Sequence, residues 1–515
     1  MYCSFLRAPT LLCAPTLLFA LPLVIGCNER VAGDEQVDTS QTETSTSETS
    51  TSESGDPDPG DTEEETGDGD GDGEPPGDLI PDGEALNPDC EVSPGDHSGV
   101  CEGPQCPILE DIELRCPHLD FVNRIELGLT PSRLYVDYRQ SWDEGSDSFI
   151  LANGEVDFVA PLPGPGFSGQ RNDGTLYRAG EGETYHRQVE GGWLQIPLLG
   201  NPVEFDPDDA EAVWPRPSLD DELHLMFAEA LSSQRGGTKF HWLAPHDGGW
   251  VVEEVTVGDV ARWPLVVDFD PLGRRHVWME IYDEPEDLSF RVFGEPETQL
   301  PAFSGDAYAG RNQVPTPPRP ALGAEGPPLA MLRAHQQNLV LLTGHDPGDL
   351  IETPIAGARH LEDRCDSDYS SFQAPCEPCE YDDAGVEFSN YELVRGSHGE
   401  LWGVWLWISV DASMSSQQVD NTCVGSVDSI EATGELRIVE LGADASVGRQ
   451  LAIPLDGLVA FEIGSSSNRT FSATAYDDVI AVALEVAVDT DYAYPFNDDT
   501  NLMTRVMVID TTLIE

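Results

Sequence analysis

Short apolar runs separated by turn residues fill the chain from about residue 119 to its end. The clearest example is Pro264–Tyr282, PLVVDFDPLGRRHVWMEIY, in which an apolar strand, an Asp/Pro/Gly turn and a second apolar strand follow one another. This order predicts a β-hairpin. A helical period is not sustained over ten residues, and Asp206–Ala212 is the one segment that suggests it. The sequence therefore predicts an all-β body.

The second strand of that hairpin belongs to a series of similar apolar segments, most of which follow a turn. The series is Arg133–Tyr138, Thr175–Tyr177, Glu222–Phe227, His276–Ile281, Asn338–Leu342, Leu401–Trp407 and Val479–Leu484. Two Gly-Gly-Trp sequences, Glu190–Trp193 and Asp247–Trp250, each open a later strand. A turn, a strand, a longer loop and a Gly-Gly-Trp strand are what one four-stranded blade of a β-propeller would show.

Several of these segments are apolar on both faces, such as VWLWIS at Val404–Ser409 and VIAVALEV at Val479–Val486. A strand with two apolar faces is expected where each sheet lies between two others. We therefore predict a β-propeller of about six to eight blades, with seven preferred. A pair of β-sandwiches or another β-rich body is the alternative.

The N-terminus has the pattern of a secretory signal over residues 1–26. Arg7 precedes Leu11–Ile25, an apolar run that two prolines interrupt and that is too short for a good membrane span. The run ends in Val24-Ile25-Gly26-Cys27, which resembles the bacterial lipobox, with Val24 in place of the commoner Leu. The resemblance implies that Cys27 is acylated and becomes the first residue of the mature protein. The alternative is a simple signal peptide with a chance cysteine.

An acidic, Ser/Thr/Gly/Asp-rich stretch follows over residues 27–89. It holds too few apolar residues to offset the entropy of ordering, so we expect a disordered tether. Asp68–Gly73 matches the start of a calcium loop, but the twelfth position of that loop is Leu79 and not Glu, which favours a linker. Asn28 stands after Cys27 where an Asp would resemble an inner-membrane retention signal. This favours the outer membrane or the cell surface.

The net charge of −69, from 26 basic and 95 acidic residues, argues against binding of nucleic acid. Such binding needs Lys and Arg to neutralise phosphates. The same charge argues against docking of the body onto anionic lipid, and it makes divalent cations plausible counter-ions.

Eight cysteines remain once Cys3, Cys13 and Cys27 are set aside, and they form two local groups. The groups are Cys90, Cys101, Cys106 and Cys116, and Cys365, Cys376, Cys379 and Cys423. In an exported protein, two even groups suggest two disulfides in each, with the pairing left open. A zinc site or a redox motif at Cys376–Cys379 is the alternative. The first group predicts a small disulfide-bonded module at residues 90–118.

Two acidic loops could hold calcium through hard oxygen ligands, although solvated turns would show the same composition. The candidate ligands are Asp206, Asp208, Asp209, Asp489 and Asp491. No other cofactor is expected.

The phrases PSLDDELHLMFAEA (Pro217–Ala230) and PLVVDFDPLGRRHVWMEIYDE (Pro264–Glu284), with the Gly-Gly-Trp strands, resemble sialidase-like repeats of the Asp-box type. The full S-x-D-x-G-x-T-W signature is absent, and Asn172–Thr175 is its nearest fragment. The resemblance implies a propeller. It also implies an alternative function as a carbohydrate-active hydrolase, which would need two carboxylates and three convergent arginines. The candidates are Asp268, Asp270, Glu280, Asp283, Glu284, Arg274, Arg275, Arg291, Arg311 and Arg333.

The sequence favours a binding protein over an enzyme, because serine-hydrolase, zinc-protease and P-loop motifs are absent. We expect four regions: a signal at 1–26, a tether at 27–89, a disulfide-bonded module at 90–118 and a propeller-like domain at 119–515. The lipid anchor would hold the protein in the cell envelope. The propeller would bind or scaffold a glycan or protein ligand, with Trp193, Trp250 and Trp278 as places of contact.

Overall fold

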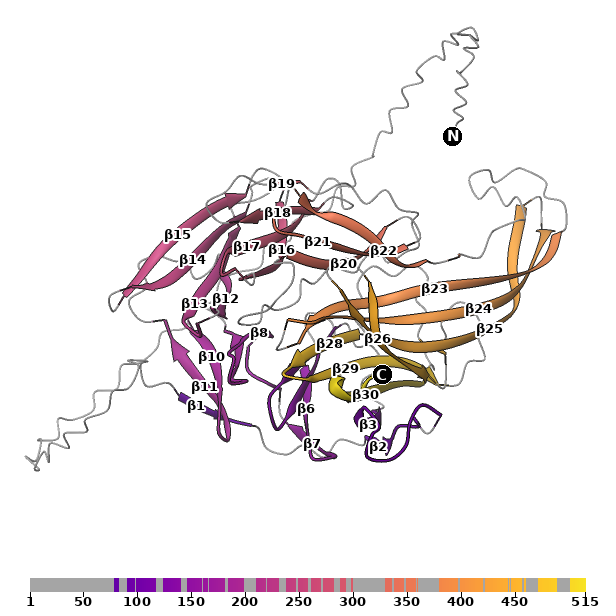
Figure 1. The fold of residues 1–515 in the computed structure, drawn as a ribbon, viewed down its shortest axis with the longest axis horizontal. Helices are drawn as coiled ribbons and strands as arrows, with labels where there is room; N and C mark the ends of the chain where they lie inside the picture. Colours follow the sequence, from indigo (N-terminus) through magenta and orange to yellow (C-terminus); the bar gives the residue numbers. More distant parts are fainter. Residues whose placement is uncertain are drawn as a thin grey trace, which may run out of the picture. The chain divides into compact units, whose positions relative to one another are not determined.

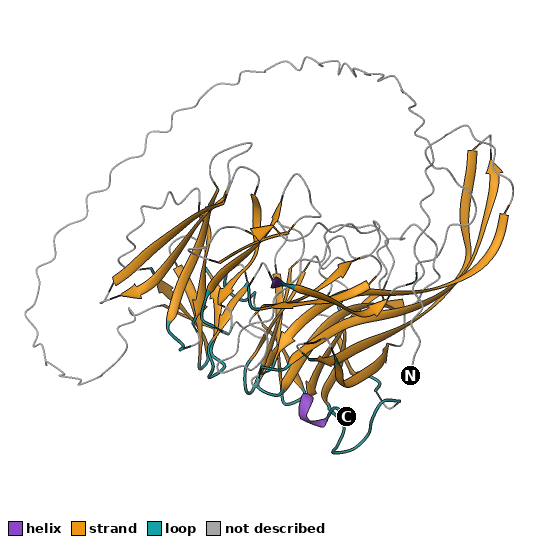
Figure 2. Cartoon of the chain, turned by 45° about the horizontal axis from the view of Figure 1, so that its top comes forward, coloured by secondary structure: helices purple, strands orange, loops and turns teal. Residues whose placement is uncertain are grey.

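A computed structural model of the chain describes residues 78–515 with gaps, the longest at 199–209, 300–328, 360–378, 460–470 and 489–500. The signal, Cys27 and the tether up to residue 77 lie outside the described residues. The described chain is almost wholly β (Figures 1 and 2), and its strands form seven antiparallel sheets. Each sheet takes most of its strands consecutively from the chain, so we number the sheets as blades 1 to 7 in sequence order.

Blades 1 to 3 come from the N-terminal half of the propeller. Blade 1 contains β4 (Arg124–Leu129), β5 (Leu134–Arg139), β6 (Ser146–Ala152) and β7 (Glu155–Val159). Blade 2 contains β8 (Phe167–Gln170), β9 (Leu176–Ala179), β10 (Thr184–Val189) and β11 (Gly192–Pro197), with β1 (Asp78–Pro81) added beside β11. Blade 3 contains β12 (Ala210–Pro217), β13 (Leu223–Ala230), β14 (Thr238–His246) and β15 (Gly249–Val257).

Blades 4 to 6 continue in the same order. Blade 4 contains β16 (Ala261–Phe269), β17 (Arg275–Ile281), β18 (Leu288–Val292) and β19 (Thr298–Gln299). Blade 5 contains β20 (Leu329–His335), β21 (Asn338–Gly344) and β22 (Ile351–Gly357). Blade 6 contains β23 (Cys379–Arg395), β24 (Leu401–Val419), β25 (Thr422–Leu441) and β26 (Val447–Leu455).

Blade 7 combines the C-terminal strands of the chain with two strands that precede blade 1 in the sequence. Its C-terminal strands are β27 (Leu458–Val459), β28 (Phe471–Tyr476), β29 (Val479–Val488) and β30 (Asn501–Asp510). Its N-terminal strands are β3 (Ile108–Arg115), which pairs with β30, and β2 (Glu91–Pro94), which pairs with β3. The chain ends in the 3₁₀ helix η2 (Thr511–Leu513), the short purple helix of Figure 2.

Contacts between successive blades close the sheets into a ring. The first strands meet where β4 contacts β8, β8 contacts β12, β20 contacts β23, β23 contacts β28, and β28 contacts β4. Blades 3 and 4 meet through β14 and β16. Blades 4 and 5 meet through an ion pair of 2.6 Å between Arg274 and Asp346. The fold is therefore a seven-bladed β-propeller, as the sequence predicts.

The predicted repeat is confirmed strand by strand. Each of the seven apolar segments overlaps the second strand of a blade, and three of them begin one residue before it. These strands are β5, β9, β13, β17, β21, β24 and β29. The predicted hairpin is formed by β16 and β17, with Phe269 opposite Arg275 across the turn. The weak helical pattern at Asp206–Ala212 is not borne out in its described part, because Ala210 begins β12. There, pairing with β13 overrides local propensity.

The hydrophobic core lies between neighbouring blades. Along β29, Ile480, Val482 and Leu484 pack with residues of blade 6, whereas Ala481 and Ala483 pack with residues of blade 1. Both faces of the strand are thus buried, which explains the unbroken apolar run VIAVAL.

The N-terminal boundaries differ from the expected ones in one respect. Asp78–Pro81, expected to belong to the disordered tether, forms β1 on the edge of blade 2. Pairing with β11 supplies the backbone hydrogen bonds, and Ile80 packs against a buried cluster of blades 1 and 2. Asp78–Pro81 therefore belongs to the folded chain and not to the predicted tether.

The predicted cysteine-rich stretch contains two disulfides, Cys90–Cys116 and Cys101–Cys106. Its strand β3 is hydrogen-bonded to β30, so this stretch supplies the outer part of blade 7. Strands β2 and β3 thereby share one sheet with the C-terminal strands of the chain.

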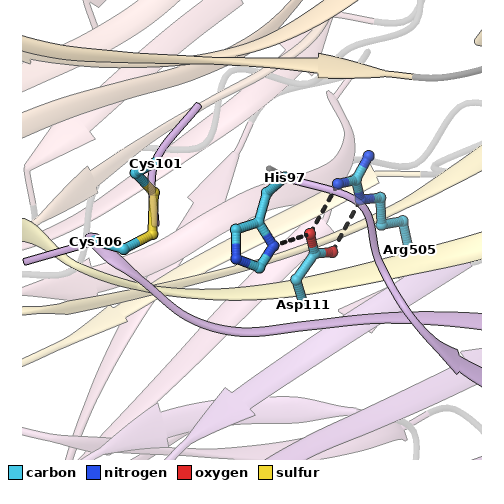
Figure 3. The surroundings of a disulfide bond; sticks show 5 residues. All are labelled: His97, Cys101, Cys106, Asp111 and Arg505. Carbon is cyan, nitrogen blue, oxygen red and sulfur yellow. Dashed lines mark hydrogen bonds and ion pairs between the residues drawn. A yellow bond between two sulfur atoms is a disulfide. The ribbon is translucent and has the colours of Figure 1, made fainter. Parts of the chain in front are cut away.

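A buried ion pair fixes β3 on β30. Arg505 on β30 donates from Nε and Nη2 to Asp111 on β3, over 2.9 and 2.8 Å (Figure 3). His97 adds a third contact to Asp111 through Nδ1 at 2.9 Å. The Asp111 and Arg505 side chains are only 0% and 2% exposed. A buried pair of this kind stabilises the fold when both charges are satisfied, and its loss is costly.

Replacement of Asp111 by Ala should lower the free energy of unfolding by about 3–5 kcal/mol, because it leaves the Arg505 charge buried without its partner. Urea unfolding measures this. Glu435→Ala, which removes a half-exposed pair with Arg437, is the matched control and should cost less than about 1 kcal/mol. Equal losses in the two variants would contradict the structural role of Asp111.

Candidate functional site

A buried ion pair also joins blades 1 and 2. Arg178 on β9 is 0% exposed, and its Nη2 lies 2.7 Å from Oδ2 of Asp137 on β5. Ser148 on β6 donates to the other Asp137 oxygen over 2.8 Å. Arg178 also donates to the carbonyl oxygens of Pro163 and Gly164. These bonds offset the cost of removing both charges from water, so the pair serves to hold the two blades in register.

Aromatic rings surround the Arg178 guanidinium. Its carbon lies 4.5 Å from the centre of the Phe167 ring and 5.8 Å from that of Trp193, within the range of cation–π attraction. Tyr135 meets Trp193 edge-on at 5.6 Å. Trp193 is 0% exposed, so the expectation that it contacts a ligand is wrong. It fills the interface between blades 1 and 2 because a large apolar ring is needed there.

The other two candidate tryptophans differ from Trp193. Trp250 is half-buried and packs against the cluster that contains Tyr177. Trp278 lies on β17, and its side chain is outside the described residues. Trp250 is therefore the candidate tryptophan that combines a described side chain with partial exposure.

A neutral histidine lies between blades 3 and 4. Trp242 donates from Nε1 to Nδ1 of His224 over 3.0 Å, and the His224 ring lies 4.9 Å from that of Phe269. Burial, together with the positive charge of Arg275, lowers the pKa of His224 to about 4. At neutral pH, His224 is therefore an uncharged acceptor for the Trp242 hydrogen bond.

The candidate arginines of the hydrolase hypothesis are placed in part. Arg274 pairs with Asp346 and also donates to the carbonyl of His345, and Arg275 pairs with Glu253 on β15. Both arginines thus join neighbouring blades. The side chains of Arg291 and Arg333, and all of Arg311, lie outside the described residues.

The side chains of the candidate carboxylates of that hypothesis lie outside the described residues. Asp268 lies on β16 and Glu280 on β17, with side chains outside the described residues. Asp270, Asp283 and Glu284 are outside altogether. A pair of catalytic carboxylates in this group therefore stays a prediction.

The calcium candidates Asp206, Asp208, Asp209, Asp489 and Asp491 also lie outside the described residues. Among the residues that the structure describes, no group of three His, Cys, Asp or Glu side chains could hold a metal ion. In the same part of the chain, no helix is long and apolar enough to cross a membrane.

The second cysteine group is placed by its backbone alone. Cys379 on β23 is opposite Ser416 of β24, and Cys423 on β25 is opposite Gln418 of β24. Strands on either side of a central strand are about 10 Å apart, beyond the roughly 7 Å limit for the Cα atoms of a disulfide. This register excludes a bond between Cys379 and Cys423. Cys365 and Cys376 lie outside the described residues.

The residues of the two buried ion pairs, one between blades 1 and 2 and one within blade 7, were missed by the motif search. Asp137, Arg178, Asp111 and Arg505 belong to no catalytic motif, yet each is buried. Three of them interrupt an apolar strand, in LYVDYR, LYRA and LMTRVMVID. A charged residue inside such a strand is the signal that could have identified them, because burial of an unpaired charge is too costly.

No protein-family model matches the chain, and no curated protein matches it. Among solved structures, the chain is similar to a protein of unknown function from Dyadobacter fermentans, with 10% identity over 79% of this chain and 100% of that one and a TM-score of 0.32. It is also similar to the WD40 domain of SCAP from fission yeast (9% identity, 83% and 99% covered, TM-score 0.29). A third similar structure is the subtype N11 neuraminidase-like protein of a flat-faced bat H18N11 virus (10% identity, 83% and 96% covered, TM-score 0.25). At these scores the similarity carries nothing about activity, and the fold assignment rests on the strand pairing.

His224 should make stability depend on pH. Its pKa is lowered from 6.5 to about 4, so protonation favours the unfolded chain, and the stability is complete above pH 6.5 and lost as the pH falls toward 4. His224→Asn keeps an acceptor near Nδ1 but does not titrate. The difference in free energy of unfolding between the wild type and His224→Asn should fall by about 1–2 kcal/mol from pH 7 to pH 4, after discounting for solvent screening.

Urea unfolding at several pH values measures this difference. Parallel profiles for the wild type and His224→Asn would contradict the neutral, buried state of His224.

Proposed function

We propose that the chain is an exported, lipid-anchored protein of the cell envelope whose seven-bladed propeller binds or scaffolds a ligand. The observation that carries export is the pair of disulfides, Cys90–Cys116 and Cys101–Cys106. Disulfides persist in oxidising compartments and are rare where thiols are kept reduced. The apolar run at Leu11–Ile25 supports the same conclusion from the sequence.

The anchor is proposed from Cys27 and the lipobox-like residues before it. Each buried CH₂ group of an acyl chain contributes about 0.8 kcal/mol, so two or more chains hold a protein on a membrane for long times. The acidic residues between Cys27 and Asp78 would keep the propeller in solution above the lipid, because like charges repel anionic head groups.

A binding role for the propeller is supported by the use that the chain makes of its charged side chains. In the described part, Arg178, Arg505, Arg274 and Arg275 each engage a carboxylate at a contact within or between blades. Because these arginines stabilise the scaffold, we expect loops and exposed strand edges to make the ligand contacts. The ligand class stays open between a protein and a glycan.

Cys27→Ser tests the anchor. The wild type, expressed with a labelled fatty acid in a bacterial host, should carry the label and partition with membranes. The thioether to the lipid needs the Cys27 thiol, and a serine hydroxyl cannot form it. Cys27→Ser should lose both. Cys13→Ser, inside the expected signal, is the matched control and should behave as the wild type. Unchanged membrane partitioning of Cys27→Ser would refute the anchor.

A further inference from the structure

The outer edge of blade 2 already accepts an added strand. β1 pairs antiparallel with β11, with Ile80 opposite Trp193 and Pro81 opposite Gly192. The amide of Asp82 donates to the carbonyl of Gly191 over 3.2 Å. Addition of an extended segment to a sheet edge is a common mode of peptide recognition, in which main-chain bonds give affinity and side chains give selectivity.

The Gly-Gly-Trp sequence makes this docking possible. A Cβ atom on Gly192 would lie 2.2 Å from the carbonyl oxygen of Ile80 and 2.7 Å from the Cα of Pro81, so any larger residue there would push β1 away. Trp193 provides the apolar surface on which Ile80 packs. The glycine admits the backbone of the added strand and the tryptophan holds its side chain.

Blade 3 contains the same hairpin at the same position. In blade 2, Gly192 is opposite Val189 and Trp193 is opposite Gln188. In blade 3, Gly249 is opposite His246 and Trp250 is opposite Pro245. Both hairpins therefore have a two-residue turn and place Gly-Trp at the start of the fourth strand.

The surroundings of the two tryptophans correspond as well. Trp193 packs in a cluster with Tyr135 of the preceding blade, and Trp250 packs against a cluster with Tyr177 of the preceding blade. Tyr135 and Tyr177 are the second residues of β5 and β9. The edges of β11 and β15 are thus repeats of one structure.

The two edges differ in what covers them. Within the described strands, β15 pairs with β14 alone, whereas β11 pairs with β10 and β1. Trp250 is half-buried and the Val251 side chain beside it is 48% exposed, whereas Trp193 is fully buried. The first four residues of β15, Gly249–Val252, contain neither charge nor proline, and an apolar edge of this kind invites pairing with another chain. The outer strands β22 and β26, by contrast, contain Pro354 and Pro454.

We propose that the edge of β15 is a strand-docking site for a partner protein. The docked segment would be extended and would contain two adjacent apolar residues followed by proline. We infer this sequence from β1, which binds the equivalent edge of β11 through Leu79-Ile80-Pro81. At β11 the acidic residue after the proline pairs with Arg133 at 3.0 Å. Arg133 directly precedes β5 of blade 1, and the residue that directly precedes β9 of blade 2 is Thr175. Because Thr175 carries no charge, the segment at β15 needs no acidic residue after its proline.

A synthetic peptide with the sequence of residues 76–83, PGDLIPDG, tests the proposal on the full chain. It should bind with a dissociation constant between about 10 µM and 1 mM, measured by calorimetry, because a short strand gains few contacts. A peptide with Ala in place of Asp82 should bind equally well. Absence of binding at about 1 mM peptide would overturn the proposal.

Three variants locate the site. Gly249→Val and Val251→Asp should each weaken binding at least about tenfold, the first by blocking the backbone and the second by removing apolar surface. Val447→Asp, at a valine that is 54% exposed on β26, is the matched control and should leave affinity unchanged. Melting temperatures check that the variants fold. A further variant, Gly192→Val, tests whether the peptide instead replaces β1 beside β11. Loss of affinity in Gly192→Val, with affinity unchanged in Gly249→Val and Val251→Asp, would overturn the assignment to β15.

Discussion

The fold depends on one constraint, the pairing of β3 with β30. It joins residues far apart in the chain, and the hydrogen bond between Asp111 and Arg505 spans 394 positions. Closure of so long a loop costs conformational entropy, so the pairing has to bring strong interactions between β3 and β30. The buried ion pair supplies one, and the disulfide Cys90–Cys116 holds β2 beside β3. With blade 7 complete, β28 can pack on β4 and the ring is closed.

Buried polar contacts also lie at the interfaces between blades that the structure describes in detail. Arg178 and Asp137 join blades 1 and 2, and neutral His224 lies with Trp242 and Phe269 between blades 3 and 4. Apolar surfaces alone could slide past one another, whereas a buried polar pair has one favourable register. Each interface therefore combines non-directional burial with one directional contact. Arg274 and Arg275, two of the five candidate arginines, likewise form ion pairs between neighbouring blades.

The all-β class, the hairpin at Pro264–Tyr282 and the seven repeated segments follow from the sequence, because strands buried on both faces require continuous apolar runs. Three features could not be predicted. The partner of β3 is set by tertiary pairing over the whole chain, which short-range patterns do not encode. The role of Trp193 depends on β1, a strand that emerges from a stretch with the composition of a disordered tether. The disulfide pairing of the first cysteine group likewise required the geometry of β2 and β3.

The central claim is that the N-terminal strand β3 is an integral part of blade 7 and closes the propeller. Native-state hydrogen exchange, followed by mass spectrometry of peptides from Ile108–Arg115 and Asn501–Asp510, tests it most directly. The account predicts that amides of β3 and β30 are protected to the same extent and lose protection together as denaturant is added. Rapid exchange throughout β3 while β30 stays protected would contradict it.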